Sequence, residues 1–86
     1  MILNIFGEKE LKDIIDFLLK LIVDFPDKVQ INEVNGEKIT VLEISVDPND
    51  IGKIIGKQGR VIKAIRTIVK AATIKDNKRT VIEIIE

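Results

Sequence analysis

Hydrophobic and polar residues repeat with a helical period over residues 8–25, EKELKDIIDFLLKLIVDF. At about 100° per residue, the charged residues of this segment form a polar stripe that covers about 120° of the helix. The stripe consists of Lys12, Asp13, Asp16, Lys20 and Asp24. The remaining arc is almost entirely apolar, so the helix is either deeply buried or meets another subunit with a second apolar face, and we favour the second interpretation. Pro26 ends the helix after Phe25, because the residue before a proline disfavours the α conformation.

Two strand patterns follow this helix. Residues 28–34, KVQINEV, alternate between apolar and polar side chains. Residues 37–46, EKITVLEISV, are rich in β-branched residues and predict a partner strand. Between them stands Asn35-Gly36, a strong hairpin signal because both residue types tolerate a positive φ. The pattern therefore predicts an antiparallel pair of strands.

The second half of the chain predicts two further helices and a last strand. Residues 47–50, DPND, form a turn in which Asn49 or Asp50 is expected to cap the next helix. We then expect a short helix at Ile51 to Ile55, a longer helix from about Arg60 to Ile74, a loop at 75–79 and a strand from Thr80 to Ile85. The order α-β-β-α-α-β over a single domain, residues 1–86, predicts an α+β fold with the helices on one face of a three-stranded mixed sheet. The third strand lies parallel to the second, because the two helices between them are long enough for a crossover.

Two glycines interrupt the apolar run between the last two helices, in the segment Gly56-Lys57-Gln58-Gly59. The segment that begins at Gly52 does not form a Walker A phosphate loop, because it has one residue too few between its glycines and has Gln58 where a hydroxyl residue is required. The dinucleotide-binding fingerprint GxGxxG is also absent. A GxxG turn between two helices remains. Without β-carbons, Gly56 and Gly59 allow a sharp turn and the close approach of a sugar-phosphate backbone. The next helix directs its free N–H groups and positive dipole end toward this turn.

The helix after the turn separates apolar from basic residues. Its basic residues fall within about 120° of one another and are Arg60, Lys63, Arg66 and Lys70. No acidic residue on this face can form an i,i+4 ion pair with them. The positive region is extended on either side of the helix by Lys57, Lys75, Lys78 and Arg79. A solvated face is the common explanation of such a pattern, but the adjacent glycine turn favours an anionic ligand.

Charge and composition narrow the function further. The net charge is zero, yet residues 1–50 hold five Lys/Arg and eleven Asp/Glu, whereas residues 51–86 hold nine and three. This asymmetry is compatible with an interaction surface and equally with two halves that neutralise each other. Because the chain has no Cys, His or Tyr and no Asp/Glu pair with the spacing of a metal or acid–base site, we predict no enzyme, cofactor or metal. With no signal peptide or membrane-spanning stretch in the sequence, we expect a cytoplasmic protein.

The segment IGKIIGKQGRVIKAIR resembles the signature of KH domains, in which an Ile/Val-Ile-Gly-x-x-Gly-x-x-Ile core joins two helices. The matching residues are Ile54, Ile55, Gly56, Gly59 and Ile62. The order of elements is similar to the type II arrangement of bacterial KH domains. The resemblance extends over residues 8–86, which leaves residues 1–7 as a short N-terminal extension. Within this group, the chain is similar to the small bacterial stand-alone KH proteins of the KhpA group.

This resemblance implies a single-stranded RNA-binding protein whose GxxG turn clamps about four nucleotides, with single-stranded DNA as an alternative ligand. The strand would lie in a groove between the two helices on one side and the sheet with the loop at 75–79 on the other. Its bases would rest on aliphatic side chains such as Ile51, Ile54, Ile55 and Ile62. The residues expected to bind RNA are Lys53, Ile55, Gly56, Lys57, Gln58, Gly59, Arg60, Lys63, Arg66, Lys78 and Arg79.

The resemblance also implies partners. In several bacteria, members of this group pair with a larger protein that carries a KH domain and a second nucleic-acid-binding domain. We therefore expect a homodimer, or a heterodimer with such a larger protein, that acts as a post-transcriptional regulator or RNA chaperone. The wide apolar arc of the first helix would supply the contact, and avidity would raise the affinity of a lone module. The alternative is a protein-interaction subunit with a KH fold and little RNA binding of its own.

Overall fold

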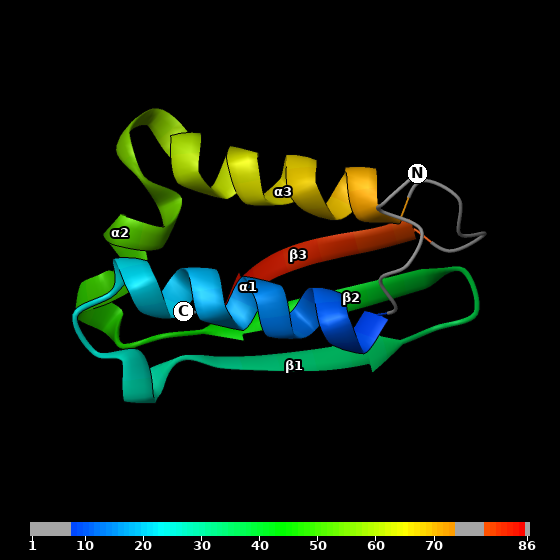
Figure 1. The fold of residues 1–86 in the computed structure, drawn as a ribbon, viewed down its shortest axis with the longest axis horizontal. Helices are drawn as coiled ribbons and strands as arrows, with labels where there is room; N and C mark the ends of the chain where they lie inside the picture. Colours follow the sequence, from blue (N-terminus) through cyan, green and yellow to red (C-terminus); the bar gives the residue numbers. More distant parts are fainter. Residues whose placement is uncertain (1–7, 74–78, 86) are drawn as a thin grey trace.

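The helices and strands follow one another in the order that the sequence predicts. A computed structural model describes residues 8–73 and 79–85. Its elements are α1 (Glu8–Ile22), β1 (Gln30–Asn35), β2 (Ile39–Ser45), α2 (Ile51–Ile55), α3 (Arg60–Ala72) and β3 (Arg79–Ile85), together with the 3-10 turns η2 (Pro26–Lys28), η3 (Pro48–Asp50) and η4 (Lys57–Gly59) (Figure 1). The expected extension 1–7, the end of the predicted helix at Ile74 and the basic residues Lys75 and Lys78 lie outside the described residues. Within the described part of the chain, no helix has both the length and the apolar character needed to cross a membrane.

The described strands form one mixed sheet in the order β1-β2-β3. β1 and β2 are antiparallel, with Ile31 opposite Ile44. β3 runs parallel to β2, with Ile82 beside Leu42, and the chain passes through α2 and α3 between them (Figure 1). Both the predicted mixed sheet and the predicted parallel crossover are confirmed.

The connection between β1 and β2 differs from the expected two-residue turn. Residues 36–38 lie between the strands, and the Gly36 N–H donates to the Ile39 carbonyl oxygen at 2.8 Å. Neither Asn35 nor Gly36 has a positive φ. The antiparallel hairpin is present, but the prediction that Asn35 and Gly36 form its turn with positive φ angles is wrong. The Asn35 side chain acts instead as an acceptor, because Thr40 Oγ1 donates to its Oδ1 at 3.1 Å across the end of the hairpin.

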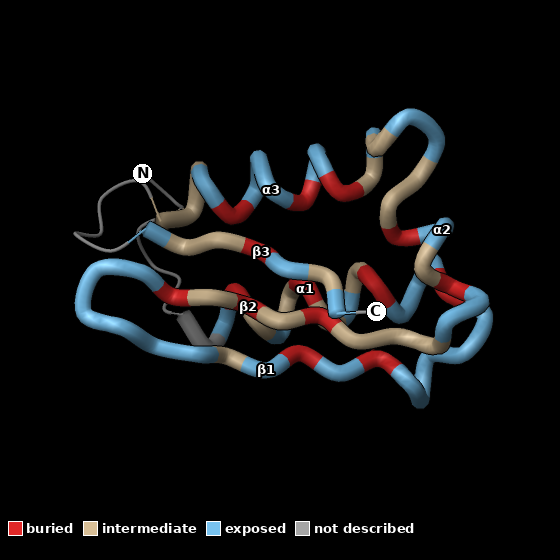
Figure 2. The backbone as a smooth tube through the Cα atoms, turned by 180° about the vertical axis from the view of Figure 1, so that it is seen from behind, coloured by how far each residue is buried: buried red, intermediate tan, exposed pale blue. Residues whose placement is uncertain are grey.

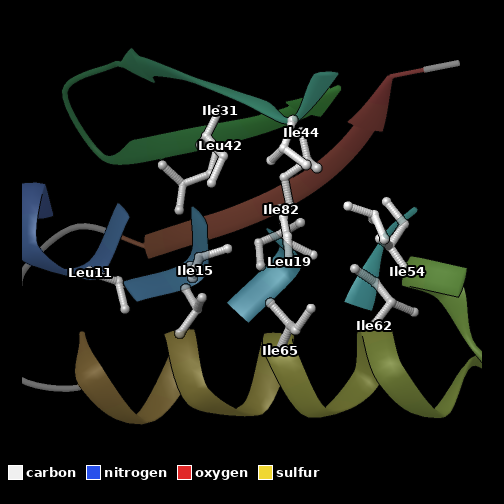
Figure 3. Close-up of a cluster of buried hydrophobic side chains, with 13 residues drawn as sticks. Leu11, Ile15, Leu19, Ile31, Leu42, Ile44, Ile54, Ile62, Ile65 and Ile82 are labelled. Atoms are coloured by element: carbon white, nitrogen blue, oxygen red, sulfur yellow. The ribbon is translucent and has the colours of Figure 1, made fainter. Parts of the chain in front are cut away.

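The core lies between the sheet and the helices, which pack on one face of it as predicted (Figures 1 and 3). Side chains from every described helix and strand meet there, among them Leu11, Ile15, Leu19, Ile31, Leu42, Ile44, Ile54, Ile62, Ile65, Val69 and Ile82. Along β2, buried residues alternate with more accessible ones, and no described element covers the opposite face of the sheet (Figure 2). Val34 and Glu83, for example, point to this open face and are exposed.

α1 ends at Ile22, three residues before the predicted end at Phe25. The N–H of Val23 still donates to the Leu19 carbonyl oxygen at 3.1 Å. The next two backbone N–H groups leave the helical direction and donate to the side chain of Asp50. A competing acceptor, rather than the proline alone, therefore sets the end of the helix.

The apolar arc of α1 is divided between the core and the surface. Ile15 and Leu19 are fully buried against the sheet and α3. Phe17 and Leu21, four residues apart on another side of the helix, are 63% and 68% exposed, and Phe25 beyond the helix is also exposed. Contacts among the described residues thus do not bury the whole arc, which leaves an apolar surface on α1.

Candidate nucleic-acid interface

A sharp turn at residues 56–59 separates α2 from α3 (Figure 1). Gly56, Gln58 and Gly59 have φ values of +79°, +58° and +74°. The Gly56 N–H closes α2 by donating to the Gly52 carbonyl oxygen at 2.9 Å, and the Gly59 N–H donates to the Gly56 carbonyl oxygen at 3.0 Å. The two glycines therefore allow two helices to meet at a compact turn, as predicted from the sequence.

Gln58 is the one non-glycine residue with a positive φ in the part of the chain that the structure describes. A left-handed conformation costs a residue with a side chain about 1 kcal/mol or more. Its side chain is exposed and accepts a 3.4 Å hydrogen bond from Arg60 Nη2. Backbone strain of this kind concentrates at functional sites, which singles out the middle of the turn.

The turn presents polar groups to solvent at the beginning of α3. Lys57, Gln58 and Arg60 are exposed, and no side chain caps the first turn of α3 at Gly59. The free N–H groups of a helix start and the positive end of its dipole favour an anion at this place. The formal charges of Lys57 and Arg60 add to the same field.

The exposed side of α3 continues this positive surface. Its basic residues are all exposed and are Arg60, Lys63, Arg66 and Lys70. Among the side chains of residues 10–73 and 79–85, none of the four forms an ion pair. The opposite side of the helix is buried through Ile62, Ile65 and Val69. α3 is therefore apolar toward the sheet, and every exposed charged residue on it is a cation, but Ala64, Thr67 and Ile68 are exposed as well, so the prediction of a purely basic outer side is wrong in part.

Comparison with known families identifies this arrangement. The family model "KhpA/KhpB, KH domain" matches residues 12–84, which include all of α2, the glycine turn and α3. The chain belongs to the KhpA/KhpB family of KH domains. The predicted family and type of fold are thereby confirmed.

Relatives within the KhpA/KhpB family cover most of the chain. A protein of Clostridium acetobutylicum named "RNA-binding protein KhpA" is 55% identical over 75 residues, which is 87% of this chain and 100% of that protein. The protein of the same name from Clostridium perfringens is also 55% identical over 75 residues, again 87% of this chain and 100% of the relative. That of Aquifex aeolicus is 51% identical over 76 residues, 88% of this chain and 96% of its own length. No solved structure matches the chain.

Lys53 is placed apart from the other expected RNA-binding cations of this KhpA/KhpB-family chain. Its ammonium group contacts the carboxylate of Asp24 and lies 3.9 Å from Oδ1 of Asp50. It thus points from α2 toward the end of α1. Its positive charge is compensated there, whereas that of Lys57 is not compensated by any described carboxylate.

The aliphatic residues expected to carry bases fall into two groups. Ile54 and Ile62 are core residues, 0% and 6% exposed, and are closed to a ligand. Ile51 and Ile55 are half-buried and keep accessible surface on α2. Because they and Gly52 fall on one arc of α2 at about 100° per residue, an apolar strip with an exposed backbone leads up to the glycine turn.

Arg79 lies far from the glycine turn along the molecule. It is the first residue of β3, beside Ile39 in the parallel pair, and its N–H donates to the Lys38 carbonyl oxygen at 2.9 Å. This is the end of the sheet near the last turn of α3, whereas the glycine turn precedes the first turn (Figure 1). The structure therefore does not bring Arg79 together with Lys57, and Lys78 lies outside the described residues.

Asp50 has a role that the sequence did not reveal. Either Asn49 or Asp50 was expected to cap the following helix, but the side chain of Asp50 makes no capping hydrogen bond to α2. Asp47 is the local cap instead, because its Oδ1 accepts the Asn49 N–H at 2.9 Å. The partners of Asp50 are Asp24 and Phe25, which are 26 and 25 residues away in the chain. No local pattern could indicate a contact of this separation.

Proposed function

We propose that this chain binds single-stranded RNA through the glycine turn and the basic side of α3. The observation that carries the proposal is the exposed Lys57-Gln58 turn. It stands at the start of a helix that has no side-chain cap and whose exposed charged residues are all cations. The name of the relatives, "RNA-binding protein KhpA", supports the same ligand. RNA is favoured over single-stranded DNA on the strength of these names alone.

In the proposed complex, phosphates lie beside the turn, close to the side chains of Lys57 and Arg60. The bases rest on the strip formed by Ile51 and Ile55. The three phenylalanines of the chain all precede residue 26, and there is no Tyr or Trp, so aromatic stacking does not contribute. We expect a clamp of about four nucleotides with modest, salt-dependent affinity.

We further propose that the chain works as an assembly rather than alone. The exposed Phe17 and Leu21 of α1 are suited to contact a second copy, or a larger RNA-binding protein that carries a KH domain. Such an assembly would join two weak RNA sites and raise the effective affinity. A cytoplasmic regulator or chaperone of RNA is the cellular role that follows.

The loop variant Lys57→Asp/Gln58→Asp tests the proposed RNA site. Crosslinking to random-sequence single-stranded RNA should be lost, because two carboxylates would face the phosphates, while the circular dichroism spectrum stays unchanged. The control is Lys28→Asp/Gln30→Asp, which changes the same residue types at exposed positions outside the turn. Random-sequence single-stranded DNA in a parallel assay gives the preference between the two nucleic acids.

The exposed apolar side of α1 supports a second candidate function, that of a protein-interaction subunit with little RNA binding. This candidate predicts that the loop variant and its control behave alike. Equal crosslinking of the loop variant and the wild-type chain would therefore replace the first proposal by the second.

A further inference from the structure

The side chain of Asp50 is buried beneath the end of α1. It is 0% exposed, although its residue type is usually found at the surface. Oδ1 accepts the Asp24 N–H at 3.1 Å and Oδ2 accepts the Phe25 N–H at 3.0 Å, so both carboxylate oxygens are used. Lys53, one turn further along α2, places its ammonium group 3.9 Å from Oδ1 and also contacts the Asp24 carboxylate. We refer to the two hydrogen bonds to Asp50 as the carboxylate clamp.

The clamp acts on a helix that cannot hold its own position. α2 contains only five residues, and a helix of this length is unstable in isolation. Contacts at its two sides must therefore fix it. Ile54 anchors one side in the core, and the carboxylate clamp ties the residue before its first turn to the end of α1.

The glycine turn begins directly after α2. Gly56 is the residue at the end of the helix, and its N–H donates to the Gly52 carbonyl oxygen in the first turn. Because only the five residues of α2 separate Asp50 from Gly56, a shift of α2 at the clamp also displaces the turn.

We infer that Asp50 is a positioning residue for RNA binding, which holds α2 so that the turn at residues 56–59 stands at the correct angle to α3. The inference rests on the proposed RNA-binding function and adds a residue that touches no RNA itself. Asp50 and the proposed partner surface meet at the end of α1, because the N–H of Phe25 is held by the clamp while its side chain is exposed.

The variant Asp50→Asn weakens the carboxylate clamp while it keeps the size and shape of the residue 50 side chain almost unchanged. An amide oxygen can accept one of the two N–H groups, but the amide NH₂ then faces the other N–H, donor against donor. The control for lost stability is Leu11→Ala, which removes a core side chain in the first turn of α1, at the other end of that helix. Asp24→Asn is a second control, because it removes the carboxylate partner of Lys53 but keeps the backbone N–H that the clamp uses.

The position of the turn is read from the backbone amide signals of the glycines in ¹H–¹⁵N spectra. In Asp50→Asn the signals of Gly52, Gly56 and Gly59 should move, whereas that of Gly36 in the β1–β2 connection should not. Affinity for single-stranded RNA, measured at a temperature where every variant is folded, should fall by about tenfold in Asp50→Asn. It should stay within about twofold of wild type in Leu11→Ala and Asp24→Asn.

The inference is overturned if the glycine signals of Asp50→Asn coincide with those of wild type, or if Leu11→Ala weakens RNA binding as much as Asp50→Asn. A wild-type chain that binds no RNA would remove the proposed function, and the glycine signals would still decide whether Asp50 positions the turn.

If Asp50→Asn does not fold, the inference is tested on the wild-type chain instead. Because coupling is reciprocal, RNA should slow amide exchange of Asp24 and Phe25, and unchanged exchange on RNA binding would overturn the inference.

Discussion

Gly56 and Val61 are in contact across the turn between α2 and α3. A β-carbon on Gly56 would lie 2.9 Å from both the backbone nitrogen and Cβ of Val61 and would overlap its Cγ2. A β-carbon on Gly59 would meet only Cε of Lys63, at 3.8 Å. The two glycines are thus required for different reasons: Gly56 by its φ and by the packing of α3, and Gly59 by its φ alone.

Alanine substitutions should separate these two requirements. Gly59→Ala should lower the free energy of unfolding by about 1 kcal/mol, the cost of a left-handed alanine. Gly56→Ala adds a clash with a packed side chain and backbone, and should cost about 2–4 kcal/mol. Urea denaturation of the two variants measures the difference. Equal losses would mean that the turn moves away from Val61 at little cost.

In contrast to Gly56 and Gly59, Gly52 should become more favourable for stability when it is replaced by alanine, while RNA binding is weakened. It is exposed and helical, and a β-carbon there would meet nothing within 4 Å. Gly52→Ala should therefore raise the free energy of unfolding by about 0.5–1 kcal/mol. If bases rest on the strip with Ile51 and Ile55, the added methyl group should weaken RNA binding at the same time.

The control for Gly52→Ala is Thr67→Ala, which also places alanine at an exposed helical position, two turns into α3. It should stabilise the chain slightly and leave RNA affinity unchanged. A Gly52→Ala chain that is more stable and binds RNA as tightly as wild type would show that RNA does not approach this side of α2.

The salt dependence of RNA binding should distinguish Lys57 from Lys53. Each phosphate contact to a single strand contributes about 0.7 to the slope of log affinity against log salt. Lys57→Ala should reduce the slope by about that amount, because its ammonium group faces solvent beside the turn. Lys53→Ala should change it little, since Asp24 and Asp50 already compensate its charge.

Lys28→Ala, which removes an exposed cation from η2, is the reference for a general charge effect in this titration. Filter-binding or fluorescence anisotropy over a series of salt concentrations gives the slopes. A larger change for Lys53→Ala than for Lys57→Ala would mean that Lys53 leaves Asp24 when RNA binds.

Polar substitutions on α1 should cause the proposed assembly to dissociate. Phe17→Ser/Leu21→Ser removes two large exposed apolar side chains and should raise the dissociation constant of a homodimer by about a hundredfold or more. Ile39→Ser, at a 46% exposed position of β2, is the matched control and should assemble like wild type. Sedimentation equilibrium measures both. A wild-type chain that stays monomeric at the highest attainable concentration would leave only the heterodimer.

The elements that follow from local patterns were predictable from the sequence. The alternation in β2, the apolar and basic sides of α3 and the separation of two helices by Gly56 and Gly59 all depend on residues close together in the chain. Each of them is present in the structure. The parallel pairing of β3 followed from the length of the intervening segment.

What could not be predicted depends on contacts between distant residues. α1 ends at Ile22 because a carboxylate from residue 50 takes the next N–H groups, and the sequence around Pro26 contains no sign of this. Lys53 was expected among the RNA-binding residues, but its ammonium group contacts the carboxylate of Asp24, which is 29 residues away in the chain. Which aliphatic residues near the turn are core and which are accessible was likewise decided by tertiary packing.

The parallel pairing of β3 with β2 also bears on how the chain folds. The β1–β2 hairpin closes over residues 36–38, whereas β3 can dock only after residues 46–78 have been arranged. Closing the longer segment costs more chain entropy, so we expect the hairpin to form early and the third strand to complete the sheet last. The glycine turn lies inside the segment that must close, and substitutions there should change the refolding rate as well as the affinity for RNA.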